Sequence, residues 1–278
     1  MKKITDIKGT FRLHNDVKIP YLGLGTYQAE SGDEVISAVK YALETGYRHI
    51  DTASYYDNEE GVGQGIKESQ VPREEIFVTT KVWNSDQGHD STLKAFDASI
   101  NKLGLDYLDL YLVHWPVVGK YKETYRALEQ LYNDGRIRAI GVSNFLQHHI
   151  EDLLQHCQVR PMVNQCEFHP RLVQRELQNF CKCENIQYQA WSPLMQGGIF
   201  KIDTINALAE KYQKDAAQIT VRYALQKGIV TIPKSTSEGH IKSNADVFDF
   251  EISSEDIQKL DALDQHYRTG PDPDHVDF

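Results

Sequence analysis

Short β-rich runs and amphipathic helical runs alternate along almost the whole chain, and this alternation restricts the fold more than any other feature. In the helical runs, apolar residues recur every three or four positions, as Phe96, Ile100 and Leu103 do. Strict alternation of strands and helices is typical of a parallel sheet with helical crossovers. Eight such units in 278 residues predict an α/β fold, a (β/α)8 TIM barrel, with a doubly wound sheet as the competing arrangement. The expected strands cover residues 21–25, 48–51, 76–82, 108–114, 137–142, 162–166, 186–190 and 229–232.

The length allows either two domains of about 150 residues or one barrel that uses the whole chain. No Gly/Ser-rich or Pro-rich linker and no internal repeat divides the sequence, so we predict that residues 1–278 form a single domain. Residues 11–20 contain a polar turn between two alternating arms, which predicts an N-terminal β-hairpin that closes the bottom of the barrel. A helix is expected over residues 32–45, and the tail 269–278 is irregular.

Charge and composition exclude several classes of protein. The chain has 40 acidic and 30 basic residues, and its formal charge of −10 disfavours a nucleic-acid partner. No apolar run reaches the roughly 18 residues of a membrane-spanning helix, and the polar start M-K-K-I-T lacks the apolar core of a signal peptide. The 4 cysteines show no C-x-x-C spacing, which is typical of reduced thiols. We therefore expect a cytoplasmic protein with no nucleic-acid or membrane partner.

Three histidines, His148, His149 and His156, lie on one expected helix. We expect them to be solvated side chains rather than ligands, and we predict no metal site.

Four titratable residues fall at or just after the expected strand ends. Asp51 ends one strand, Lys81 lies near the end of the next, His114 ends the one after that, and Tyr56 follows Asp51 by five residues. In a barrel these positions meet at one mouth, where active sites are built. Each residue has a structural alternative: an ion pair for Asp51 and Lys81, a core histidine, an interfacial tyrosine. Their joint placement at one mouth favours a catalytic site.

The four side chains also suit one kind of chemistry. A tyrosine hydroxyl has an ordinary pKa of about 10, and a neighbouring ammonium is expected to lower it. An aspartate beside the ammonium would hold it in place and charged, while a histidine can orient a carbonyl oxygen. Such a site protonates an oxygen on which charge develops, as in the reduction of a carbonyl by hydride.

Several sequence blocks together resemble the aldo-keto reductase superfamily. They are Gly46-Tyr-Arg-His-Ile-Asp-Thr-Ala53, Tyr56-Asp-Asn-Glu59, Leu103-Gly-Leu-Asp-Tyr-Leu-Asp-Leu-Tyr-Leu-Val-His-Trp-Pro116, Ile140-Gly-Val-Ser-Asn-Phe145 and Ile232-Pro-Lys-Ser235. The blocks stand in the family's order and span nearly the whole chain. The length is similar to that of the compact bacterial members, which include 2,5-diketo-gluconate and glyoxal or methylglyoxal reductases.

The resemblance implies NAD(P)H-dependent reduction of aldehydes and reactive ketones to alcohols, with Tyr56 as the general acid. Lys81 and Asp51 would tune Tyr56, and His114 would position the substrate carbonyl. It also implies NADPH bound across the barrel mouth without a Rossmann domain, and Gly61-Val-Gly63-Gln-Gly65 lacks the glycine spacing of a dinucleotide loop. The implied substrate pocket contains Tyr27, Trp83 and Trp115. The implied cofactor contacts are Gly25, Thr26, Ser143, Asn144, Gln165, Trp191, Ser192, Pro193, Leu194, Lys234, Ser235, His240 and Asn244.

One position departs from the family pattern. Relatives that prefer NADPH usually carry an arginine six residues after the lysine of I-P-K-S, where this chain has His240. An imidazole offers less positive charge to a 2′-phosphate than a guanidinium does. We therefore expect NADPH to bind and NADH to be used as well.

Two other functions remain open on sequence grounds. The same fold serves some relatives as a regulatory or structural module that keeps the cofactor without turnover. A barrel alone is also compatible with a sugar isomerase or hydrolase, but no cluster of metal-binding or paired catalytic carboxylates appears at the expected strand ends. The resemblance favours an enzyme with a small-molecule carbonyl substrate that acts as a monomer.

Overall fold

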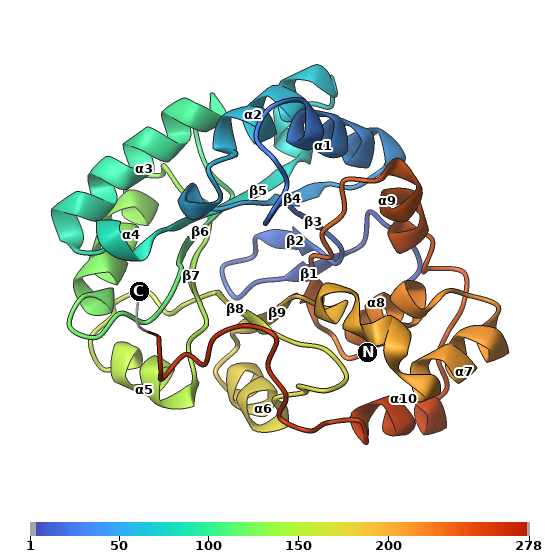
Figure 1. Cartoon of the computed structure of the whole chain (residues 1–278). Coiled ribbons are helices and arrows are strands. Elements are labelled where there is room, and N and C mark those ends of the chain that lie inside the picture. The colour runs from blue at the N-terminus through green and yellow to red at the C-terminus, as the bar shows by residue number, and fades with distance from the viewer. Residues whose placement is uncertain (1–3, 277–278) are drawn as a thin grey trace.

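The computed structural model describes residues 4–276, and its centre is a parallel sheet of eight strands in the order β10-β9-β8-β7-β6-β5-β4-β3. The edge strands β3 and β10 also meet, since Gly23 N donates to Thr231 O at 2.9 Å and Thr231 N donates to Tyr21 O at 3.0 Å. This contact closes the sheet into a barrel and excludes the doubly wound alternative (Figure 1). The strands are β3 (Leu24–Gly25), β4 (His49–Asp51), β5 (Phe77–Val82), β6 (Leu110–Val113), β7 (Ile140–Ser143), β8 (Val163–Glu167), β9 (Gln187–Trp191) and β10 (Val230–Thr231).

Helices surround the sheet (Figure 1), and their buried apolar side chains belong to the hydrophobic core. In α1, for example, Val35, Val39 and Leu43 are buried at helical spacing. Four short 3₁₀ turns lie in the loops: η1 (Ser54–Tyr56), η2 (Arg73–Glu75), η3 (Asn84–Asp86) and η4 (Met195–Lys201). The α-helices are α1 (Asp33–Thr45), α2 (Glu59–Glu68), α3 (His89–Leu103), α4 (Tyr121–Asn133), α5 (Gln147–Leu154), α6 (Arg175–Cys183), α7 (Asp203–Tyr212), α8 (Ala216–Gln226), α9 (Glu238–Ala245) and α10 (Ser254–Asp261).

The predicted N-terminal hairpin is present as β1 (Thr10–Arg12) paired with β2 (Lys18–Pro20). Its turn lies at the bottom of the barrel, because Asn15 Nδ2 donates to the carbonyl of Arg138, which precedes β7, at 2.9 Å. The hairpin covers the bottom of the barrel. The opposite end, where the strands have their carboxyl ends, stays open for a functional site.

All eight predicted strands are confirmed, and no strand end differs from its predicted position by more than three residues. The predicted helix over residues 32–45 is α1, and Gly61, Gly63 and Gly65 lie inside α2 rather than in a loop between a strand and a helix. Within residues 4–276, no helix combines the length and the apolarity needed to cross a bilayer.

The chain after α10 crosses the open end of the barrel as an irregular segment, which we call the C-terminal strap (residues 264–276). It runs from α10 past α6 toward α5 (Figure 1). Its first part is fastened to the loop after β8, where Gln265 N and Tyr267 N both donate to the carbonyl of Arg171. The irregular tail predicted from Thr269 onward is therefore confirmed as far as Val276, and the last two residues of that prediction, Asp277 and Phe278, lie outside the described part of the chain.

Candidate active site

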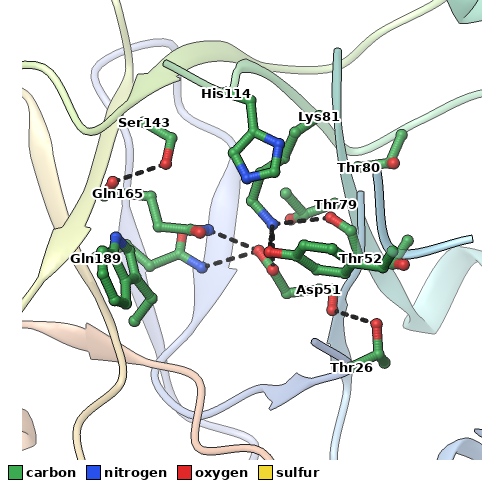
Figure 2. A network of polar contacts seen from close by, with 12 residues as sticks. Thr26, Asp51, Thr52, Thr79, Thr80, Lys81, His114, Ser143, Gln165 and Gln189 are labelled. Atoms are coloured by element: carbon green, nitrogen blue, oxygen red, sulfur yellow. Dashed lines mark hydrogen bonds and ion pairs between the residues drawn. The ribbon is translucent and has the colours of Figure 1, made fainter. Parts of the chain in front are cut away.

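Three neighbouring strands and one turn deliver the four predicted residues to the carboxyl end of the barrel. Asp51 is the last residue of β4, Lys81 lies in β5, and His114 follows β6 directly. Tyr56 ends the turn η1, five residues after Asp51. Figure 2 shows the side chains of Asp51, Lys81 and His114 converging on one point. The parallel register of β4, β5 and β6 thus accounts for the cluster.

Lys81 and Asp51 form a buried ion pair at the centre of the site. Lys81 Nζ lies 2.6 Å from Asp51 Oδ1 and also donates to the carbonyl of Thr52 at 2.8 Å. The other carboxylate oxygen of Asp51 accepts hydrogen bonds from Gln165 Nε2 at 2.6 Å and from Gln189 Nε2 at 3.4 Å. Burial lowers the pKa of Lys81, but Asp51 and Tyr56 raise it by more, so the ammonium stays charged.

The third donor bond of Lys81 goes to Tyr56. Lys81 Nζ donates to Tyr56 Oη at 3.2 Å. Burial raises the pKa of Tyr56 above its ordinary value by more than Lys81 lowers it, and the charge of Asp51 adds to the increase. Lys81 does lower this pKa, as the sequence predicts, but burial outweighs its effect in the resting site. Tyr56 stays protonated at neutral pH, with an ammonium in place to stabilise the phenolate once the proton leaves.

His114 stands beside the tyrosine as a neutral ring. The two ring centroids are 5.8 Å apart, with the ring planes at 73°. Burial and the charge of Lys81 hold the pKa of His114 well below its ordinary value. Its backbone is fixed by two hydrogen bonds, from its own amide to Val82 O and from Asn144 Nδ2 to its carbonyl. A neutral imidazole held in this way can donate a hydrogen bond to a substrate oxygen without competing with Tyr56 for the acidic role.

The ends of β7, β8 and β9 bring several of the implied cofactor residues together. Ser143 Oγ donates to the carbonyl of Gln165 at 2.9 Å, and Asn144 Nδ2 lies 3.2 Å from Ser143 Oγ. Trp191 Nε1 donates to Asn144 Oδ1 at 2.8 Å, so the indole is fixed at one end. Gln165, which the resemblance assigns to the nicotinamide carboxamide, also donates to Asp51 and joins this group to the cluster of Asp51, Tyr56, Lys81 and His114.

The remaining implied cofactor residues continue around the barrel mouth past β10. Gly25 and Lys234 form a bridge, and a Cβ at Gly25 would lie 2.8 Å from the carbonyl oxygen of Ile232. The backbones at Gly25 and Ile232 are thus too close for a side chain at position 25, and they form a cradle without side chains beside Thr26. The Thr26 hydroxyl donates to the carbonyl of Asp51. Ser192, Pro193 and Leu194 follow β9, Ser235 follows Lys234, and α9 carries the exposed His240 and the buried Asn244.

Aromatic rings line the approach to the four-residue centre. Tyr27 lies 5.0 Å from the Tyr56 ring, and Trp83 lies 5.0 Å from the His114 ring. Trp115 is buried next to His114 in the chain. Tyr55 is not among the predicted residues; its ring stacks on Trp83 with the centroids 3.8 Å apart, and the residue is 52% exposed. Its position beside Tyr56 is the only sequence signal, and that signal does not tell which of the two rings faces the site.

The comparisons with known proteins agree with this geometry. The family model for the aldo/keto reductase family matches residues 21–265. The chain belongs to the aldo/keto reductase family. It is 57% identical over 274 residues to a glyoxal reductase of Bacillus subtilis, with 99% of each chain covered. It is 46% identical to the methylglyoxal reductase DkgA of Escherichia coli, with 95% of this chain and 96% of the relative covered. An aldo-keto reductase of Bombyx mori, solved in complex with NADP, superimposes with a TM-score of 0.89 at 36% identity and covers 96% of each chain.

Among the described residues of this aldo/keto reductase, one group has metal-like spacing. The ligand atoms of His148, His149 and Asp274 all lie within 4.8 Å of one another. However, His149 Nδ1 accepts the amide of Leu146 at 3.1 Å, and burial lowers the pKa of His149 to about 4. The neutral ring therefore carries its proton on Nε2, 3.4 Å from Asp274, and a protonated nitrogen cannot coordinate a metal. The group ties α5 to the C-terminal strap.

The expectation that His148, His149 and His156 lie on one helix as solvated side chains is wrong in two respects: His156 lies beyond the end of α5, and His149 is buried. The Nδ1 atom of His149 accepts a hydrogen bond from the amide of Leu146 at the start of α5. The sequence pattern does not reveal this role.

Proposed function

We propose that this aldo/keto reductase reduces aldehydes and reactive ketones to alcohols with NADPH, and that Tyr56 donates the proton. The observation that carries the assignment is the hydrogen bond from Lys81 Nζ to Tyr56 Oη, with Lys81 itself paired to buried Asp51. The glyoxal and methylglyoxal reductases among the relatives support small, reactive carbonyl compounds as substrates.

The chain's own residues supply the proton and the electrostatic stabilisation. NADPH, when bound, supplies the hydride that reaches the carbonyl carbon. Tyr56 gives its proton to the carbonyl oxygen, and Lys81 stabilises the phenolate that forms. Asp51 keeps Lys81 charged and in place. His114 donates a hydrogen bond to the same carbonyl oxygen and orients it toward Tyr56.

The barrel mouth fits a nicotinamide dinucleotide. We propose that Trp191 supports the nicotinamide ring, because flat aromatic faces bind planar rings and this indole is already oriented by Asn144. Ser143, Asn144 and Gln165 lie next to it and would bind the carboxamide. The cradle at Gly25 and Thr26, the turn at Ser192, Pro193 and Leu194, and the segment with Lys234, Ser235 and Asn244 would follow the rest of the cofactor. Support for NADP comes from the relative solved with it.

We also propose a domain organisation, a location and an oligomeric state. The eight strands share one sheet, which supports a single domain over residues 1–278. The formal charge of −10 supports a protein without a nucleic-acid partner, and free thiols at all four cysteines support a cytoplasmic location. The proposal that the chain acts as a monomer rests on the family resemblance.

The proposed function is tested by a panel of carbonyl compounds, with methylglyoxal, aromatic aldehydes, aldoses and diketo acids, assayed with NADPH. We expect NADPH consumption matched by formation of the alcohol, fastest with the small reactive carbonyls. Binding of NADPH without turnover of any compound would instead support the regulatory or structural module.

A separate prediction concerns the choice between NADPH and NADH. His240 lies in the first turn of α9 with an exposed side chain, where family members with an NADPH preference usually have arginine. We expect kcat/KM for NADPH to exceed that for NADH by less than about a thousandfold. This limit corresponds to a difference of roughly 4 kcal/mol in transition-state stabilisation. His240→Arg should raise the ratio of the two kcat/KM values about tenfold, since a guanidinium binds phosphate through two parallel hydrogen bonds.

The control for this prediction is His240→Gln, which keeps a neutral polar side chain and should leave the ratio nearly unchanged. A wild-type ratio above the thousandfold limit, or no response to His240→Arg, would show that other residues select the cofactor.

A further inference from the structure

Glu167 is a buried carboxylate at the mouth of the barrel that the proposed reaction does not use. It is the last residue of β8, and its side chain has no exposed surface. Its Oε1 lies 3.1 Å from His169 Nε2 and accepts hydrogen bonds from the amide of Thr269, at 2.6 Å, and from the Thr269 hydroxyl. Its Oε2 accepts the amide of Gly270 at 3.3 Å. One carboxylate thus holds two consecutive residues of the C-terminal strap.

The carboxylate is ionised where it holds the strap. Burial favours the neutral acid, but the hydrogen bonds from His169 and Thr269 outweigh burial and hold the pKa of Glu167 below its ordinary value. Hydrogen bonds to an ionised acceptor are about twice as strong as neutral ones. The strap is therefore attached most firmly at Thr269 and Gly270, while Asp274 makes a more exposed contact with His148 and His149.

The attached part of the strap lies directly against Trp191. A Cβ at Gly270 would be only 2.4 Å from Trp191 Cη2, with Cζ3 and Cζ2 as the next nearest atoms. The strap therefore contacts the far end of the six-membered ring, while Asn144 binds the indole nitrogen at the other end. Glu167 and Trp191 are also direct partners in the register of β8 and β9, and the Thr269 hydroxyl lies 3.3 Å from Ser192 Oγ.

We propose that Glu167 is a positioning residue for the cofactor site: by fastening Thr269 and Gly270 it holds the strap against Trp191 and fixes the indole that supports the nicotinamide. The inference rests on the proposed function, because it assigns Trp191 to the cofactor. Its physical basis is preorganisation, since an indole already held at both ends loses less conformational freedom when a ring stacks on it. Only glycine fits at position 270, because any side chain there would displace the indole.

The test measures the Kd of NADPH directly, by titration against intrinsic tryptophan fluorescence, together with kcat and KM. Glu167→Gln replaces one acceptor oxygen with an NH2 group that faces the amide donors of the strap. We expect it to raise the Kd and the KM for NADPH about tenfold, with a much smaller change in kcat at saturating cofactor. Gly270→Ala should raise the Kd similarly, although Glu167 is intact.

Three controls separate positioning from loss of structure. Glu176→Gln makes the same chemical change at an exposed position of α6 and should leave the Kd unchanged. Thr269→Val removes one donor to Glu167 and should weaken NADPH binding, while Thr269→Ser keeps the hydroxyl and should restore it. In a chain shortened after Arg268, Glu167→Gln should have no further effect on the Kd, because Thr269 and Gly270, through which Glu167 acts, are absent.

The outcomes distinguish this inference from the proposed function. If the wild-type protein binds and oxidises NADPH but Glu167→Gln and Gly270→Ala leave the Kd unchanged or lower it, Glu167 has no positioning role while the proposed function stands. An equal effect of Glu167→Gln in the full-length and shortened chains would also overturn the inference. A wild-type protein that binds no NADPH would overturn both.

Discussion

Replacing Tyr56 with phenylalanine is expected to lower kcat for carbonyl reduction about 10³-fold, because it removes the proton donor and keeps the ring. The Kd of NADPH should be almost unchanged, since Tyr56 Oη contacts Lys81 and none of the proposed cofactor residues. Lys81 should keep its charge in this variant, because Asp51 Oδ1 remains 2.6 Å from its ammonium. Steady-state rates with methylglyoxal and a fluorescence titration with NADPH measure the two quantities.

The matched control is Tyr107→Phe. Tyr107 precedes β6 at the opposite end of the barrel, with its ring under the Arg73 guanidinium. This variant also loses a single phenolic hydroxyl and should keep the wild-type kcat. A Tyr56→Phe enzyme with a kcat close to that of Tyr107→Phe would show that another group donates the proton.

Lys81→Met should reduce both the rate and the stability. The phenolate of Tyr56 loses the ammonium that stabilises it, and loss of one such electrostatic group costs about 10²- to 10³-fold in kcat. Asp51 is left as a buried carboxylate that retains only the amide donors Gln165 and Gln189. Removal of one partner from a buried ion pair lowers the free energy of unfolding by about 3–5 kcal/mol. Urea unfolding followed by circular dichroism measures the second effect.

A double variant separates the two effects. Asp51→Asn combined with Lys81→Met removes both charges, so most of the lost stability should return while the rate stays low. Recovery of activity in the double variant would show that the ion pair serves the fold alone. Failure to recover stability would show that Lys81 contributes through packing rather than through its charge.

The position of the catalytic centre could be predicted because strand ends are readable from the sequence. Asp51, Lys81 and His114 each lie at or near the end of an apolar run, and the parallel register brings such positions to one mouth. A buried charge at the other end of the barrel has a different role. Asp109 binds Arg73 at 2.8 Å and Arg138 at 2.7 Å, and this cluster only joins structural elements.

The energetics of the centre could not be predicted in the same way. The pKa of Tyr56 depends on the balance between burial and the charge of Lys81, and the sequence gives no measure of burial at a loop residue. The partners of Asp51 also come from distant strands, with Gln165 in β8 and Gln189 in β9. Only the closed barrel shows that these two amides bind the carboxylate.

The contacts of the strap are also invisible in the sequence. Glu167 is the last residue of a buried strand, and in this respect it resembles Asp51. Its partners Thr269 and Gly270 lie about 100 residues away in an irregular tail with no periodic pattern. The sequence therefore predicts the barrel and the residues of the proposed catalytic centre, but not the segment that crosses the mouth.

Single-turnover kinetics test the central claim most directly. Enzyme loaded with NADPH is mixed rapidly with methylglyoxal, and the oxidation of the bound cofactor is followed for the wild type and for Tyr56→Phe. The proposed proton donor predicts rapid oxidation in the wild type and a rate about 10³-fold lower in the variant, with equal loading of NADPH. Equal single-turnover rates in the two proteins would contradict it.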